Sequence, residues 1–371
     1  MTWQALRLRR PQAHAATVLG AACLLVAGMV GSVLAPETFA GAWIAAWWCM
    51  AGLLLGGCSV MWLHALTGGR WGEVLRPAAV RLVARRSWLL PLAIPFWLVV
   101  PLIYPWAAAD PSSAFEHLQQ PAFARAWFGG TAVGLRVLLY LGAGAWLMSS
   151  VRRPTLARRR AALSLMAWAV LGSLASVDLL MSLVPGWRST GFGLLVLTGQ
   201  MLGGAALMVA WCARHAPQRL AASPEAGSPP LGRDLGNLLL ALVMMWGYLG
   251  FMQFLIIWSE NLPPEVAWFV PRLQTGWWYA GAALVALQLV LPVALLVLRR
   301  MKDRPSPLGA TALLILAAHG LDSVWLVLPS VAPHALATWW LAPLCLVGMA
   351  LLFFSPMFEG VSTRKDSHGL A

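Results

Sequence analysis

Stretches of about 18 or more apolar residues recur along this chain from one end to the other, and each is long enough to cross a bilayer. Charged residues make up only 11% of the sequence. Soluble proteins contain about 25%, so this chain has too little charge to cover a soluble surface. Backbone groups inside lipid must be hydrogen-bonded within their own segment, so each stretch should be an α-helix. We therefore predict an all-α integral membrane protein, a single polytopic domain over 1–371, with ten transmembrane helices at Ala15–Leu34, Ala40–Leu66, Trp88–Ala107, Trp127–Ser149, Ala162–Leu183, Gly191–Trp211, Gly236–Trp258, Gly276–Leu298, Leu308–Leu328 and Ala335–Phe354.

Arginine and lysine gather on one side of this topology. Of the 26 basic residues, 22 lie before the first predicted helix, after the second, fourth, sixth and eighth helices, or in the tail 355–371. Basic loops stay in the cytoplasm, so we predict that both termini are cytoplasmic. The net charge of +13 then reflects membrane topology rather than nucleic-acid binding. One alternative stays open, because Val33–Ala35 could end a cleaved signal peptide, which would leave nine helices and the same later loops.

Tryptophans and one arginine-rich loop indicate where the membrane surfaces lie. Many of the 22 tryptophans stand near the ends of predicted helices, as in the aromatic belts of membrane proteins. Apolar residues alternate with arginines over residues 70–88, which predicts an amphipathic segment on the cytoplasmic surface.

The cysteines predict no redox cofactor on this chain. None of the five forms a C-x-x-C pair, so the sequence contains no haem-attachment motif and no cysteine ligand set for zinc or an iron–sulfur cluster. Any redox centre that works with this protein must belong to a partner or be a diffusible molecule.

A short motif occurs twice and indicates an internal duplication. Asp178 and Asp322 each stand seven residues before a proline that ends a predicted helix, and the two helices are four spans apart. The chain therefore divides into two four-helix units in parallel repeat, 40–183 (helices 2–5) and 191–328 (helices 6–9). Helix 1 (15–34) and helix 10 (335–354) flank them. Repeats of this kind are related by an axis along the membrane normal.

The two aspartates are predicted to lie about 10 Å below the outer ends of their helices, at 1.5 Å per residue. A carboxyl group at that depth is costly in lipid, so both should face the bundle interior or a water cavity. Arg136 lies at a similar level, about 13 Å past Trp127, and we predict that it pairs with Asp178. Asp322 has no arginine at its level and is the better candidate to carry a proton.

Four further polar residues are candidates for the same proton path. His319 precedes Asp322 by three residues, so both lie on one helix face. Tyr248 and Gln253 lie on helix 7, and Glu260 lies just beyond its outer end. These residues could form a proton path or a quinol-facing cluster. They could equally be interhelical hydrogen bonds that fix packing.

Three segments resemble one membrane subunit of alternative complex III, the ActF-type subunit, also called quinone-binding subunit 2 of quinol:cytochrome c oxidoreductase. Residues 178–193 resemble its D-W-x-M-S-L-x-P-H-W-x-S-T-x-F-G segment, and residues 234–265 resemble its D-L-G…W-x-Y…Q-Y-x-x-I-W-x-x-N-L-P-E-E run. His319–Pro329 is similar to its ninth-helix segment. The chain departs from the family at Gly186 and Arg233, where the family has His, at Leu179, where it has Trp, and at Asn237, where it has Lys.

This resemblance implies a polysulfide-reductase or NrfD-like membrane fold in the bacterial inner membrane, with two four-helix bundles and flanking first and last helices. It also implies a subunit without a cofactor of its own that contributes to proton transfer. Its expected partners are a sister membrane subunit with the quinol site and haem and iron–sulfur subunits that carry electrons.

The expected function is therefore that of a membrane subunit of a respiratory quinol-oxidising complex, which is not catalytic alone. Quinol or quinone would bind at or near a subunit interface. Two alternatives remain: a proton-coupled secondary transporter, which would also show repeats and buried carboxylates, or a structural or assembly protein of a respiratory oxidase.

Overall fold

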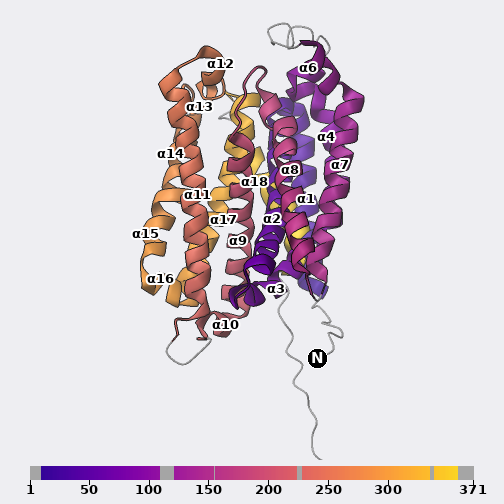
Figure 1. The fold of residues 1–371 in the computed structure, drawn as a ribbon. Helices are drawn as coiled ribbons and strands as arrows, with labels where there is room; N and C mark the ends of the chain where they lie inside the picture. Colours follow the sequence, from indigo (N-terminus) through magenta and orange to yellow (C-terminus); the bar gives the residue numbers. More distant parts are fainter. Residues whose placement is uncertain (1–9, 109–120, 154, 224–227, 335–337, 358–371) are drawn as a thin grey trace, which may run out of the picture.

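The computed structural model describes residues 10–108, 121–153, 155–223, 228–334 and 338–357 (Figure 1). Within these ranges every regular element is a helix and no strand occurs. The main helices are α1 (Arg10–Leu34), α2 (Pro36–Thr67), α3 (Trp71–Leu82), α4 (Leu89–Ile103), α6 (Pro121–Trp127), α7 (Gly130–Ser149), α8 (Arg158–Leu179), α9 (Phe192–His215), α11 (Leu231–Glu260), α14 (Trp277–Leu284), α15 (Leu291–Val297), α17 (Pro305–Val331) and α18 (Leu341–Phe354).

Eight of these helical segments in the described ranges are long and apolar enough to cross a membrane. They coincide with eight of the ten predicted spans, so the chain has the composition of an all-α, multi-pass membrane protein. The other two predicted spans contain shorter helices: α4 has 15 residues, two of them prolines inside the helix, and α18 has 14. The start of the last predicted span and most of the predicted tail lie outside the described residues.

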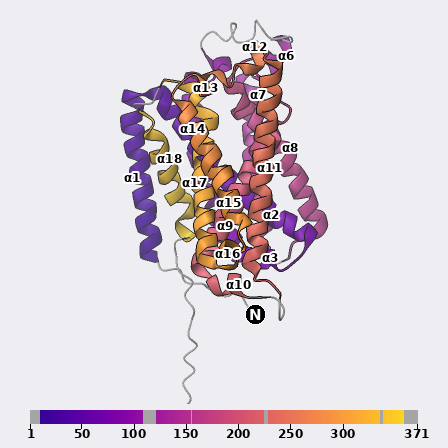
Figure 2. The same cartoon turned by 90° about the vertical axis from the view of Figure 1, so that its left-hand side faces the viewer.

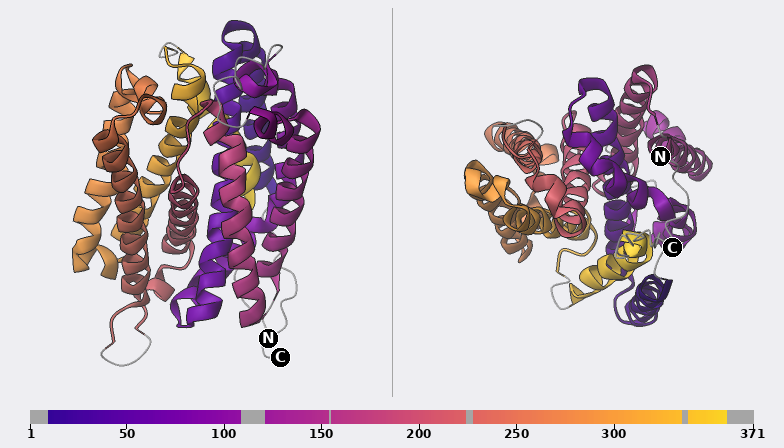
Figure 3. Two further views of the ribbon diagram at one scale, coloured as in Figure 1. Left: turned by 45° about the horizontal axis from the view of Figure 1, so that its top comes forward. Right: turned by 90° about the horizontal axis from the view of Figure 1, so that it is seen from below.

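Helix α2 lies at the centre of the molecule (Figures 1 and 2). In its most apolar stretch 94% of the residues are buried inside the protein, whereas the corresponding value for α11 is 22%. Helix α2 contacts α4, α8, α9, α17 and α18, and α1 packs on α18. Seen from below, α1 and α18 lie together at one edge of the molecule, and α11, α14 and α15 lie on another side (Figure 3). A helix enclosed on all sides contacts protein rather than lipid along most of its length.

Glycines bring α2 and α9 into backbone contact. A Cβ atom added to Gly56 would lie 1.8 Å from the carbonyl oxygen of Gln200, and one added to Gly204 would lie 2.1 Å from the nitrogen of Gly57. Only glycine fits at such a crossing, and close approach of this kind is a main source of attraction between helices in lipid.

The arginine-rich segment predicted to be amphipathic forms α3 and a following 3₁₀ helix, η1 (Val83–Trp88). Its residues Val74, Leu75 and Leu82 are buried, and α3 contacts both α2 and α9. Arg85 donates a hydrogen bond to Thr17 near the start of α1, and Trp211 donates one to the carbonyl of Met357. Both ends of the described chain therefore lie on the side of the molecule that carries α3.

Candidate functional site: two buried aspartates

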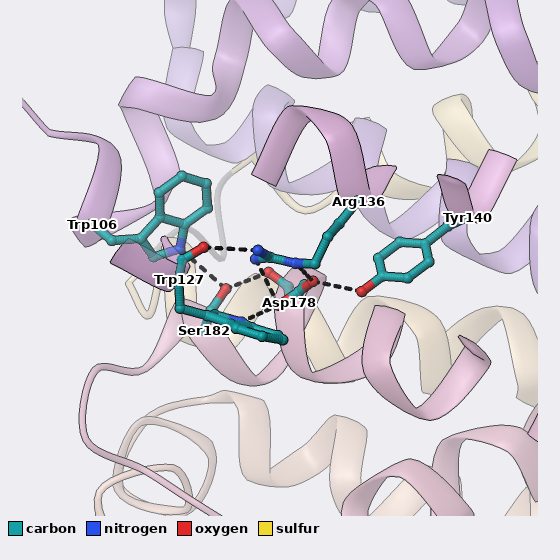
Figure 4. A network of polar contacts seen from close by, with 6 residues as sticks. All are labelled: Trp106, Trp127, Arg136, Tyr140, Asp178 and Ser182. Carbon is teal, nitrogen blue, oxygen red and sulfur yellow. Dashed lines mark hydrogen bonds and ion pairs between the residues drawn. The ribbon is translucent and has the colours of Figure 1, made fainter. Parts of the chain in front are cut away.

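Asp178 lies in the last turn of α8 and is 1% exposed. Arg136, on α7, donates two hydrogen bonds to its carboxylate, from Nε to Oδ2 at 2.7 Å and from Nη2 to Oδ1 at 3.2 Å. Trp127 Nε1 donates to Oδ1 at 2.9 Å, and the hydroxyl of Tyr140 donates to Oδ2 at 2.7 Å (Figure 4). The predicted pair of Arg136 and Asp178 is confirmed.

The residues around this pair fix its geometry. The guanidinium carbon of Arg136 lies 4.1 Å from the centre of the Trp127 ring, and its Nη1 donates to the Trp127 carbonyl at 2.9 Å. Ser182 Oγ donates to the backbone carbonyl of Asp178 and accepts a hydrogen bond from Trp106 Nε1 (Figure 4). Sequence reasoning missed Tyr140, although it stands four residues after Arg136 and so shares its helix face.

The donors around Asp178 saturate both oxygens of its carboxylate. Each carboxylate oxygen accepts two hydrogen bonds, and the arginine contributes one to each. Charge-assisted, forked pairs of this type are the strongest that side chains form. Asp178 therefore serves as one half of a structural ion pair that joins α7 and α8.

Asp322, on α17, has a different environment. The residue is buried, at 6% exposure, and Nδ1 of His319 lies 4.0 Å from its Oδ2. No arginine or lysine of the described chain forms an ion pair with it. A Cβ atom added to Gly199 of α9 would lie 3.3 Å from Oδ2 and 3.5 Å from the Trp246 ring. Asp322 thus lies between α17, α9 and α11, in the protein interior as predicted.

Two more buried polar side chains occur on or beside α17. His319 is 3% exposed and Gln288 is fully buried. Gln288 lies in a π-helical segment, η5 (Val285–Val290), which contacts α17. Neither ring nitrogen of His319 and neither amide atom of Gln288 has a hydrogen-bond partner among the described residues. Such groups are rare in folded proteins, and π-helical turns often occur at functional sites.

The remaining candidates do not join this group. Tyr248 is 59% exposed, on the outside of α11. Glu260 is exposed at the end of α11. Desolvation, and then the neighbouring carboxyl group of Glu260, raise the pKa of Glu265. Gln253 is half-buried, and its Oε1 atom has no partner among the described residues. The structure therefore brings His319 to Asp322 but places Tyr248 and Glu260 on the surface.

Arg272 is a buried arginine outside the candidates that the sequence analysis singled out. It is completely buried in α13 (Val270–Leu273). Its guanidinium donates to the carbonyls of Trp268, Trp325 and Leu326 and lies 3.5 Å from the centre of the Trp268 ring. Pro329 has no N–H, so the Trp325 carbonyl has no donor within α17, and Arg272 supplies one. Pro329 is predicted to end its helix but lies inside α17, which continues to Val331. Its missing N–H is the sequence signal that could have found this contact.

The described residues contain no group of three or more His, Cys, Asp or Glu side chains that could hold a metal ion. All five cysteines are free thiols, and four of them are buried. No protein-family model and no curated protein sequence matches the chain.

Proposed function

We propose that this protein is a membrane subunit of a respiratory quinol-oxidising electron-transfer complex, of the alternative complex III type, in which Asp322 relays protons. The observation that carries the proposal is the position of Asp322, a carboxyl group enclosed by α17, α9 and α11 without an arginine or lysine partner. The motifs around Asp178, Asp234 and Asp322, which resemble the ActF-type subunit, supply the respiratory context.

The proposal assigns different roles to the two aspartates. A carboxylate held by a forked arginine stays ionised, because the proton would have to displace strong hydrogen bonds. A buried carboxyl group with no cationic partner is neutral at lower cost and can take up and release a proton. Asp178 is therefore the structural member of the pair, and Asp322 is the proton carrier. His319, one turn away, is the neighbour best placed to exchange that proton through water.

The proposed architecture is ten spans in two parallel four-helix units, with α1 and α18 outside them. The units comprise α2, α4, α7 and α8, and α9, α11, α14–α15 and α17. Contacts between helices support the repeat: α2 contacts α4 and α8 as α9 contacts α11 and α17, and α7 packs on α8 as α14 packs on α17. Across the boundary, α2 contacts α17 and α8 contacts α9. Both termini would lie in the cytoplasm of a bacterium, on the arginine-rich side.

In this proposal the chain binds no redox cofactor. Quinol is oxidised at or near the interface with a sister membrane subunit, and haem and iron–sulfur subunits accept the electrons. The contribution of this chain is to hold the membrane part together and to provide a proton path through α17.

The test is proton movement by the whole complex. Asp322→Asn keeps the shape of the side chain but removes the titratable group. We expect proteoliposomes with the variant complex to move fewer protons per electron while the amount of assembled protein stays the same. Asp303→Asn, which changes an acid on the arginine-rich surface, is the matched control and should leave the proton count unchanged.

Two results would overturn the proposal. An Asp322→Asn complex with an unchanged number of protons per electron would remove the proton role. If the full-length protein, isolated in mild detergent, brings with it no chain that shows haem absorption, membership of the respiratory complex is wrong.

A further inference from the structure

A pocket of about 380 Å³ opens on the arginine-rich side of the molecule, where α3, α10 (Pro217–Ala221) and the start of α11 meet. Its lining includes two arginines, one acid, one hydroxyl and three apolar side chains: Arg70, Arg219, Glu73, Ser223, Val74, Ala222 and Leu231. Both arginine side chains are exposed, so a ligand can reach them from outside.

The pocket lies where the apolar helices end. Helix α2 ends at Thr67, three residues before Arg70, and α9 ends at His215, four residues before Arg219. Leu231 is the first residue of α11. Three helices that are long and apolar enough to cross a membrane therefore begin or end within a few residues of this pocket. The depth at which hydrophobic helices end is the depth of lipid head groups.

We propose that this pocket binds the phosphate of an anionic phospholipid. Guanidinium groups bind phosphate through paired N–H donors, and basic pockets between helices on the cytoplasmic side of membrane proteins bind acidic head groups. The apolar side chains of Val74 and Leu231 match the glycerol and first acyl carbons that follow the phosphate, which a soluble phosphate compound lacks. The proposal does not depend on the respiratory function.

Glu73 determines which head group fits. A carboxylate in the lining repels a second negative charge on the ligand and would attract an ammonium group. The two arginines leave the lining with a net positive charge, which favours an anionic head group over a zwitterionic one. Removing the charge of Glu73 should therefore strengthen the binding of phosphatidylglycerol.

The test measures phosphatidylglycerol binding to the full-length protein in mild detergent by native mass spectrometry. The double variant Arg70→Gln/Arg219→Gln should bind about 30-fold more weakly, because both guanidinium groups that hold the phosphate are lost. Arg158→Gln/Arg159→Gln is the control. It removes the same charge from two exposed arginines on the same side of the molecule. It should leave phosphatidylglycerol binding within about twofold.

Four results would overturn the proposal. Equal weakening in the control pair would mean general attraction to a basic surface rather than a site. Weaker binding after Glu73→Gln, together with a preference for phosphatidylethanolamine, would mean that the pocket binds a zwitterionic head group. Displacement of the lipid by millimolar inorganic phosphate would make the ligand a soluble phosphate compound. If Arg70→Gln/Arg219→Gln unfolds at the wild-type temperature and binds lipid as strongly as the wild type, the two arginines do not contact lipid.

Discussion

Removal of Arg136 is the sharpest test of the site, because the structure specifies what the change leaves behind. In Arg136→Leu, Asp178 keeps the hydrogen bonds from Trp127 and Tyr140 but loses both bonds from the guanidinium. At 1% exposure the carboxylate cannot be hydrated instead. Breaking a buried pair from one side costs about 3–5 kcal/mol, and we expect a loss of unfolding free energy in this range.

The reverse change should cost less. In Asp178→Asn the guanidinium keeps the Trp127 carbonyl and the Trp127 ring, and Arg136, at 17% exposure, can gain some hydration. Trp127 and Tyr140 donate to different oxygens of Asp178. The single amide oxygen of the substituted side chain can accept from Trp127, while the Tyr140 hydroxyl can turn to accept from the amide nitrogen. We expect a loss of about 1–2 kcal/mol, typical of a lost buried hydrogen bond. The double variant leaves no unpaired charge, so it should be more stable than Arg136→Leu by about 2 kcal/mol.

The protein carries its own reporter for this measurement. Cys49, Cys58, Cys212 and Cys345 are buried free thiols, so a thiol-reactive fluorogenic dye responds when heat unfolds the protein in mild detergent. We expect the wild type to unfold at the highest temperature and Arg136→Leu at the lowest. Asp178→Asn and the double variant should unfold between them, at temperatures close to each other. A double variant that unfolds no later than Arg136→Leu would refute the view that an unpaired buried charge causes the loss.

Three other variants test separate contacts. Gly56→Ala places a methyl group against the Gln200 carbonyl, so it should separate α2 from α9 and lower the unfolding temperature more than Gly142→Ala, whose added methyl meets open space. Arg272→Gln should cost about 3 kcal/mol of unfolding free energy, because three carbonyls lose a charged donor; stability equal to wild type would contradict the capping role. Hydrogen bonds from Arg233 hold the pKa of Asp303 below its usual range. The stabilisation is therefore complete above the unfolded carboxyl pKa of about 3.9 and is lost as the pH falls through the lower folded value. The small difference in unfolding temperature between wild type and Arg233→Gln should disappear at acid pH.

Sequence reasoning located the apolar helices well because the bilayer imposes one length and one secondary structure on each of them. It also placed Arg136 at the same depth as Asp178. Two opposite charges at one depth on neighbouring helices are expected to pair, because lipid offers neither of them another partner. The pairing followed from a rise of 1.5 Å per residue and from the cost of an isolated charge.

The parts that sequence reasoning missed depend on helix rotation and on backbone geometry. Helical spacing does not show which side of α11 faces outward. The sequence therefore predicts Tyr248 as part of the proton path, whereas the side chain is 59% exposed in the structure. Three of the acceptors of Arg272 are main-chain carbonyls, and the sequence points to one of them only through the missing N–H of Pro329. The helices α4 and α18 cover 15 and 14 residues of the predicted spans Trp88–Ala107 and Ala335–Phe354, and residues 335–337 of the second span lie outside the described part of the chain.

The glycine crossing of α2 and α9 also bears on how far the molecule can change shape. Carriers that alternate access rock one repeat against the other. Here the boundary is main chain against main chain, at Gly56 and at Gly204. Any rocking would first have to pull two helices apart. In the proposed architecture this crossing joins the two four-helix units, and it favours a subunit in which the two units keep a fixed relation.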